Sequence, residues 1–121
     1  MIALSIVVSA CAMEVVRHES SLTPAAAATR VTLASPVQVQ LDSGYARSIA
    51  AGTEFAVAGT IAEGRVLKPT RTTFTVEGAH MHEAYPVERA GRLVGFYLPV
   101  EKSFSPLSNP VNLPLQGASA K

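Results

Sequence analysis

The chain has 121 residues, which is enough for one small domain with flanking segments. Hydrophobic residues make up 48 % of it and charged residues 16 %, which excludes a disordered chain, while 6 % aromatic residues predict a small core. Ten basic and nine acidic residues are scattered and give a net charge of +1. Because the basic residues form no cluster, we expect no nucleic-acid partner and no electrostatic binding to an anionic membrane surface.

The sequence contains a single cysteine, Cys11. One cysteine excludes an internal disulfide framework and a cysteine-rich zinc module. It directly follows residues 1–10, MIALSIVVSA, which carry no charge and are mostly aliphatic. This run is too short to span a bilayer, which takes about 20 apolar residues, but it has the length of the apolar part of a signal peptide.

Val8-Ser9-Ala10-Cys11 resembles the lipobox of bacterial lipoproteins, in which an aliphatic residue and two small residues precede the lipidated cysteine. The resemblance covers these four positions and the apolar run before them. It implies a diacylglyceryl thioether on the Cys11 sulfur, signal cleavage between Ala10 and Cys11, and often acylation of the new amino group. Two or three acyl chains anchor a protein stably, since each buried methylene contributes about 0.8 kcal/mol. Ala12 follows the cysteine instead of aspartate, which by the sorting rule of such lipoproteins favours the outer membrane.

An alternative explanation of this segment stays open. Signal peptides normally begin with Lys or Arg, and residues 1–10 contain neither, which is compatible with a true start upstream of Met1. Because Ile and Val also favour strands, the same run can form an amino-terminal strand that ends in a buried, inert Cys11.

Residues 12–30, AMEVVRHESSLTPAAAATR, show no persistent apolar period and are interrupted by Pro24. We therefore expect residues 11–30 to comprise the lipidated cysteine and a flexible tether, with His18 and Glu19 as a solvated pair. A short helix that opens at Pro24 is the alternative.

Residues 31–108 show strand signals about every 8 to 12 residues and no long helical period, which predicts an all-β domain. Apolar and polar residues alternate over residues 37–41, and further strands are expected within 51–59, 64–69 and 72–78. About six strands would form a small barrel or sandwich, and an SH3-like barrel fits this number best.

Residues 80–101 predict a hairpin around Arg89-Ala90-Gly91-Arg92, where Gly91 takes the positive φ that a tight turn needs. Its second arm, GRLVGFYLPVE, is similar to the closing strands of bacterial SH3-like domains. Pro86 and Pro99 within the arms indicate edge positions or bulges. Beyond this hairpin, residues 109–121 are expected to form an extended proline-rich tail, lying along the domain or a partner.

His80 and His82 are the candidate metal ligands. On a strand they would project to the same face, and such a pair can bind zinc or copper, with Glu77 or His18 as a possible third ligand. The alternative places both histidines on a solvated face, with Met81 and Tyr85 buried. No other cofactor is indicated.

Two further residue patterns bear on function. No nucleophile elbow, phosphate-binding loop or paired carboxylates can be identified, so we expect no enzyme. A group of apolar and aromatic side chains predicts a surface groove, and its members are Phe96, Tyr97, Leu98, Phe104 and Leu107. In the favoured interpretation, Phe96, Leu98 and Phe104 belong to the core instead.

The sequence thus supports two hypotheses. The first is a non-enzymatic binding or structural module, anchored through Cys11 in the outer membrane, facing the periplasm, and bound to an envelope protein partner, for example in a secretion or conjugation complex. The second is a periplasmic metal- or small-ligand-binding lipoprotein centred on His80 and His82.

Overall fold

A computed structural model describes residues 15–27, 29–78 and 80–117. Within these ranges the chain is all-β, as predicted, and contains no helix that could cross a membrane. The strands, in chain order, are β1 His18–Glu19, β2 Thr23–Pro24, β3 Arg30–Leu33, β4 Val37–Gln40, β5 Ala46–Ile49, β6 Glu54–Ile61, β7 Gly64–Pro69, β8 Thr75–Glu77, β9 Met81–Glu83, β10 Tyr85–Arg89, β11 Arg92–Leu98, β12 Ser103–Asn112 and β13 Leu115–Gly117.

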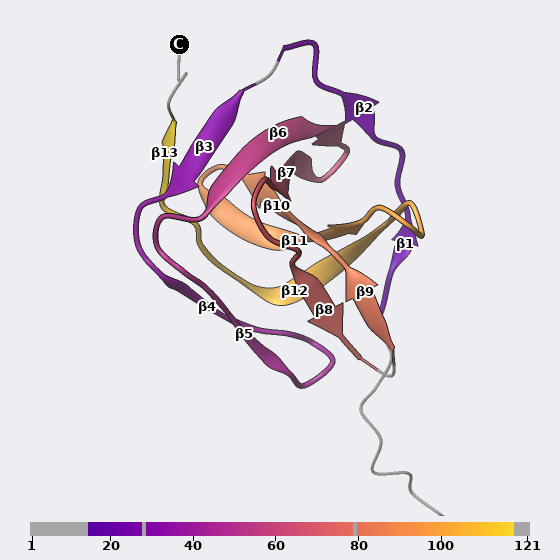
Figure 1. Cartoon of the computed structure of the whole chain (residues 1–121). Helices are drawn as coiled ribbons and strands as arrows, with labels where there is room; N and C mark the ends of the chain where they lie inside the picture. The colour runs from indigo at the N-terminus through magenta and orange to yellow at the C-terminus, as the bar shows by residue number, and fades with distance from the viewer. Residues whose placement is uncertain (1–14, 28, 79, 118–121) are drawn as a thin grey trace, which may run out of the picture.

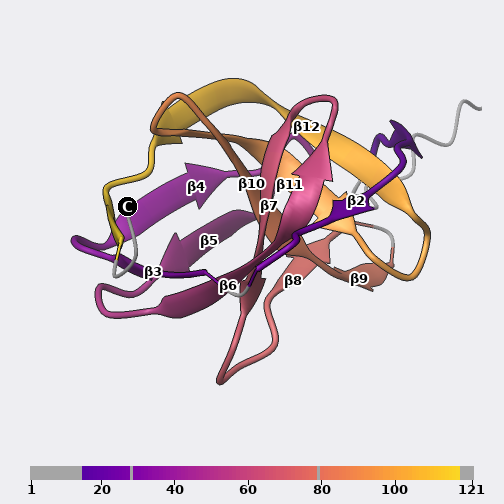
Figure 2. The ribbon, with the colours of Figure 1, turned by 90° about the horizontal axis from the view of Figure 1, so that it is seen from above.

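Nine of these strands form one antiparallel main sheet in the order β1-β12-β11-β10-β7-β6-β3-β13, with β2 pairing β6 as well (Figure 1). β2 and β3 share one edge of β6: β3 pairs with its first residues and β2 with Gly59 and Thr60 (Figure 2). The path ends at β1 and β13, which do not pair with each other, so the main sheet is not closed and the expected barrel is wrong. Two small hairpins, β4–β5 and β8–β9, complete the fold.

Several predicted strands appear where the alternation placed them. In β4, Val37 and Val39 are buried and the two glutamines between and after them are exposed. β7 covers residues 64–69, the predicted segment. Val76 of β8 is also buried, as the alternation of residues 72–78 indicates.

The predicted tight turn joins β10 to β11. Arg89 pairs with Arg92, and both residues between them have positive φ, 54° at Ala90 and 79° at Gly91. A two-residue turn of this kind matches the right-handed twist of the strands that it connects. Glycine adopts this conformation without strain, whereas alanine does so at a cost.

The first arm of the predicted hairpin is divided. Residues 81–83 form β9 and pair with β8, and only residues 85–89 form β10. Pro86 pairs with Phe96 of β11, but the pairing of β10 with β7 begins only at Val87. The proline therefore lies where β10 has no second neighbour, so its missing N–H leaves no gap in a ladder.

Two hydrophobic clusters lie on opposite faces of the main sheet, because successive side chains of a strand point to opposite faces. In β11, Phe96 and Leu98 belong to the larger cluster and Tyr97 to the smaller. We call the larger one the main core; it also contains buried residues of the two small hairpins. The second cluster consists of Ile61, Val66, Val87, Tyr97 and Phe104.

The aromatic side chains considered for a surface groove are buried, so the core interpretation is confirmed and the groove is wrong. The buried residues of this group are Phe96, Tyr97, Leu98, Phe104 and Leu107.

The described part of the expected tether, residues 15–27, is attached to the domain; we call it the N-terminal arm. Val15 is 6 % exposed and belongs to the main core, β1 pairs with β12, and β2 pairs with β6. Pro24 is the second residue of β2 and does not begin a helix. His18 contacts Glu63 instead of forming only a solvated pair with its neighbour. Backbone pairing to distant strands thus orders a segment without apolar periodicity.

The expected tail also contributes to the sheet. β12 continues past residue 108, the expected domain boundary, to Asn112, and β13 pairs with β3. Residues 109–117 therefore lie along the domain, while residues 118–121 are outside the described ranges.

Candidate functional site

The predicted lipidation and cleavage residues, Cys11 and Ala10, lie outside the described residues. The chain can be followed from Val15, four residues after Cys11. The surroundings of Val15 therefore define where the described part of the chain begins.

Val15 is held between the two small hairpins and the main sheet. With Val16 it lines a hollow of about 10 Å³ whose other walls include Leu41, Val76 and Leu107. Such a space has room for about one water molecule, so the packing around Val15 is tight.

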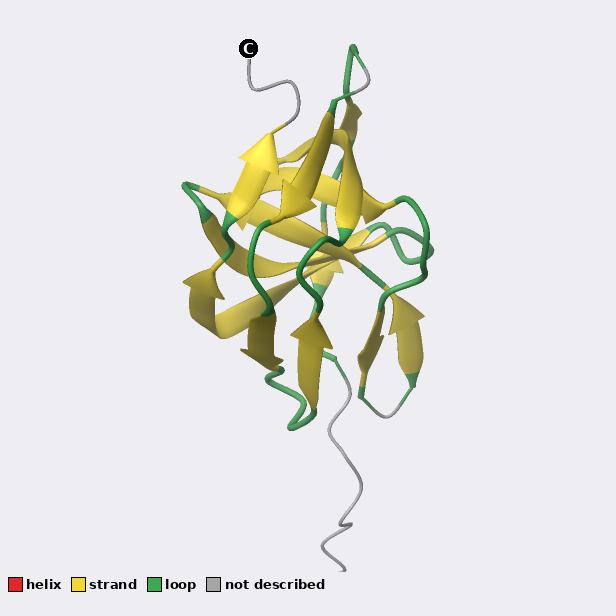
Figure 3. Cartoon of the chain, turned by 60° about the vertical axis from the view of Figure 1, so that its left-hand side comes forward, coloured by secondary structure: helices red, strands yellow, loops and turns green. Residues whose placement is uncertain are grey.

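A hydrogen-bonded turn closes this region on one side. The carboxylate of Asp42, in the β4–β5 turn, accepts hydrogen bonds from the backbone N–H of Ser108 at 3.0 and 3.2 Å and from its hydroxyl at 2.7 Å. These bonds tie the β4–β5 turn to β12. Figure 3 shows the β4–β5 and β8–β9 hairpins turning at one end of the domain, and Val15, the first described residue, lies beside residues of both hairpins. We call this end of the molecule the anchor end.

The two candidate metal ligands lie in different surroundings. His80 is exposed and precedes β9, whereas His82, within β9, is 7 % exposed. Met81 between them is exposed, so the expectation that both histidines are solvated and Met81 is buried is wrong for His82 and Met81. The cross-strand pairing explains the difference: His82 is opposite Val76, and opposite residues share a face, here the one toward the core.

His82 is paired with an acid from another hairpin. Its Nδ1–H donates to Oε2 of Glu101 at 2.8 Å, while Oε1 of Glu101 is buried without a hydrogen-bond partner among the described residues. This contact holds the β8–β9 hairpin against the turn between β11 and β12. No local signal in the sequence could have found it, because the two residues belong to separate hairpins.

A metal centre at the histidines stays a prediction. Across residues 15–27, 29–78 and 80–117, no three or more His, Cys, Asp or Glu side chains gather in a way that could hold a metal ion. The hydrogen bond from Nδ1 also commits one of the two ring nitrogens of His82 to Glu101.

A polar cluster fastens the N-terminal arm to the main sheet. Glu63, in the β6–β7 turn, accepts a hydrogen bond from Nε2–H of His18 at 3.0 Å and another from the Ser20 hydroxyl at 3.1 Å. The His18 ring also lies edge-on to Phe104, with 5.6 Å between ring centroids. Partial burial raises the pKa of Glu63, but the hydrogen bonds from His18 and Ser20 outweigh it, so the pKa lies below its ordinary value of 4.5.

An open hollow of about 500 Å³ lies beside this cluster, and its lining residues are Glu19, Ser20, Ser21, Leu22, Tyr97 and Lys102. Its two charged side chains have opposite signs, and no group of catalytic or ligating side chains converges on it. This arrangement selects neither an anion nor a cation.

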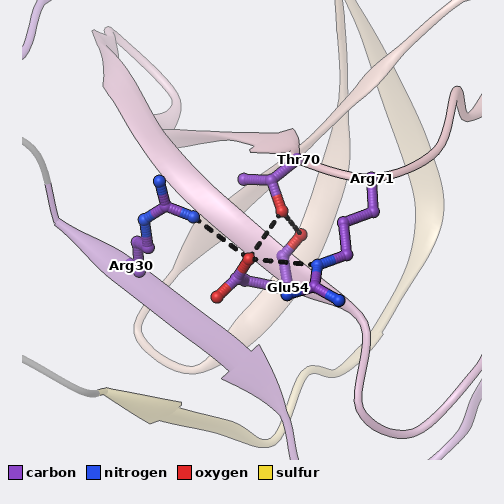
Figure 4. A network of polar contacts seen from close by, with 4 residues as sticks. All are labelled: Arg30, Glu54, Thr70 and Arg71. Carbon is purple, nitrogen blue, oxygen red and sulfur yellow. Dashed lines mark hydrogen bonds and ion pairs between the residues drawn. The ribbon is translucent and has the colours of Figure 1, made fainter.

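A second polar network joins β3, β6 and the segment after β7 (Figure 4). Oε1 of Glu54 accepts hydrogen bonds from the Thr70 hydroxyl at 2.8 Å and from Arg30 at 3.1 Å, and Arg71 lies 3.8 Å away. The Thr70 hydrogen bond is the largest cause of a lowered Glu54 pKa, and the two arginines lower it further. Arg30, Thr70 and Arg71 each contact Glu54, so the network braces the sheet.

Comparison with known proteins adds no assignment: no protein family, no curated protein and no solved structure matches this chain.

Proposed function

We propose that the protein is a lipoprotein of the bacterial outer membrane that faces the periplasm and acts as a non-enzymatic binding or structural module. The lipobox residues Val8 to Cys11 carry this proposal, because their cysteine is the only one in the chain and directly follows the only apolar run near the start. A folded β domain that begins at Val15 is what such an anchor would hold.

The working part of this module is the β domain, and its partner is another envelope protein, for example a subunit of a secretion or conjugation complex. The main sheet has two short end strands, β1 and β13. The backbone of an end strand can accept a further strand from a partner, which is a common form of protein recognition. We also propose that residues 91–101, which include β11, are similar to the closing strands of bacterial SH3-like domains.

The test is lipidation of Cys11 in a Gram-negative host that expresses the full chain. We expect the wild type to sediment with the outer membrane and its intact mass to show cleavage before Cys11 and two or three acyl chains. Cys11→Ser removes the thiol that forms the thioether, so this variant should move to the soluble fraction.

Ser9→Ala is the matched control, because it keeps a small residue within the lipobox and leaves the cysteine in place. It should remain lipidated and membrane-bound. A wild-type chain without acyl groups would overturn the proposal.

A further inference from the structure

Exposed apolar side chains gather at the anchor end. The described residues include four exposed large hydrophobic side chains: Val16, Tyr45, Met81 and Val100. Val16, 63 % exposed, is the second described residue of the chain; Tyr45, 42 % exposed, ends the β4–β5 turn; and Met81, 68 % exposed, begins β9. Figures 1 and 3 show these three segments at the same end of the molecule.

We propose that the anchor end lies directly on the bilayer surface, with Tyr45 and Met81 in the headgroup region. This inference rests on the proposed lipidation of Cys11. It goes further because it fixes the orientation of the domain and names the surface that contacts lipid.

The length of chain between the anchor and the domain supports this contact. Cys11 and the buried Val15 are four residues apart, and a fully extended chain spans at most about 3.6 Å per residue, or about 14 Å in all. The acyl chains of Cys11 enter the hydrocarbon core, so the chain must first cross a headgroup region about 5–8 Å thick. Little length remains to hold the domain away from the membrane.

The side chains at this end suit the bilayer interface. Tyrosine is enriched there because its ring is apolar and its hydroxyl polar, and methionine is flexible and apolar. Asp42, the charged residue of the β4–β5 turn, is already hydrogen-bonded to Ser108. The covalent anchor also holds these side chains at a high effective concentration near lipid, so even a weak affinity suffices.

Quenching by lipid nitroxides tests the orientation. Because Cys11 carries lipid and is the only cysteine, an introduced cysteine is the only free thiol in the lipidated protein. We would label Tyr45→Cys, Met81→Cys and Ala26→Cys with a small fluorophore and place each protein in phosphatidylethanolamine–phosphatidylglycerol vesicles that contain headgroup nitroxides. Ala26 is exposed in the segment between β2 and β3, at the opposite end of the molecule (Figure 1).

We expect loss of most of the fluorescence at positions 45 and 81 and little loss at position 26. The same Met81→Cys change in a Cys11→Ser background should not be quenched, which excludes partition of the label itself. Equal quenching at all three positions, or none at 45 and 81, would overturn the inference; in the second case the exposed side chains serve a protein contact.

Failure of the proposed function has a different signature. If Cys11 is not lipidated, the intact mass lacks acyl chains and the unmodified wild-type chain itself takes up the thiol label. A lipidated protein with a flat quenching profile would reject only the orientation.

Discussion

The two faces of the main sheet are closed in different ways. The main core is covered by β4–β5 and β8–β9, two hairpins whose buried side chains belong to it. The second cluster is covered by the N-terminal arm, from which Leu22 packs against it and which contributes only two strands of two residues each. The same strands are therefore buried by well-packed hairpins on one face and by a thin segment of chain on the other. We therefore expect damage to the main core to unfold the domain and damage to the arm to act locally.

The largest expected effect is that of Phe96→Ala. Phe96 is 1 % exposed and stacks on Phe74 with 5.4 Å between ring centroids, so its removal leaves a cavity in the main core. We expect the free energy of unfolding to fall by about 3–5 kcal/mol, measured by urea denaturation. Leu22→Ala removes a partly buried side chain of the arm and should cost only about 1–2 kcal/mol. Equal losses for the two variants would contradict the difference between the two covers.

Gly59→Ala should separate the arm from the sheet. A Cβ at this position would overlap the carbonyl oxygen of Thr23 and lie 2.9 Å from the Cα of Pro24, so β2 cannot keep its place on β6. The amide of Ala25, which donates to the Ala58 carbonyl at 3.0 Å, should then exchange its hydrogen rapidly. The free energy of unfolding should fall by about 1–3 kcal/mol.

Gly52→Ala is the control for that substitution. Gly52 has a φ of +85°, so alanine is strained there, but no atom lies within 4 Å of its Cβ position. The variant should be less stable than the wild type while the Ala25 amide stays protected. Fast exchange of this amide in both variants would mean that general loss of stability, and not the clash, detaches the arm.

The smallest effect concerns the polar fastening of the arm at Glu63. Its folded-state pKa lies below 4.5, so its ionised form contributes stability that is present above about pH 4.5 and is lost as the pH falls through the folded-state pKa. Glu63→Gln should lower the free energy of unfolding at pH 7 by less than about 1 kcal/mol, because the side chain is partly exposed. The difference from the wild type should vanish in more acidic urea titrations.

Glu19→Gln removes an exposed carboxylate from the same arm and serves as the matched control. It should change the stability less than Glu63→Gln at pH 7. A Glu63→Gln difference that persists unchanged at acidic pH would show that packing, and not charge, links this residue to the arm.

The elements that the sequence predicts well are those with strong local signals. The alternation in β4, the bounds of β7 and the turn at Ala90-Gly91 all follow from periodicity and turn chemistry within a few residues. Phe96 and Leu98 are two residues apart in β11, so they point to the same face of the strand, and both belong to the main core. Each of these features can be recognised without knowing which distant strand lies next to it.

The elements that the sequence does not predict depend on distant partners. β1 and β2 are too short to show a period, and they exist because β12 and β6 offer free backbone groups to pair with. His82 lies toward the core because of its pairing with Val76, and Glu101 reaches it from another hairpin. For the candidate site, the proposed lipobox rests on the sequence alone, whereas Val16, Tyr45 and Met81 come to the same end of the molecule only in the folded chain.

The pairing of β1 with β12 has a consequence for the order of folding. His18 pairs with Phe104, so β1 cannot dock until nearly the whole chain has been synthesised, whereas neighbouring strands such as β6–β7 and β10–β11 can pair as soon as both are made. The part of the domain that is synthesised first is therefore among the last to be fixed in place. During that interval the second cluster lacks the part of its cover that β1 provides, and His18 and Glu19 are still free of the sheet.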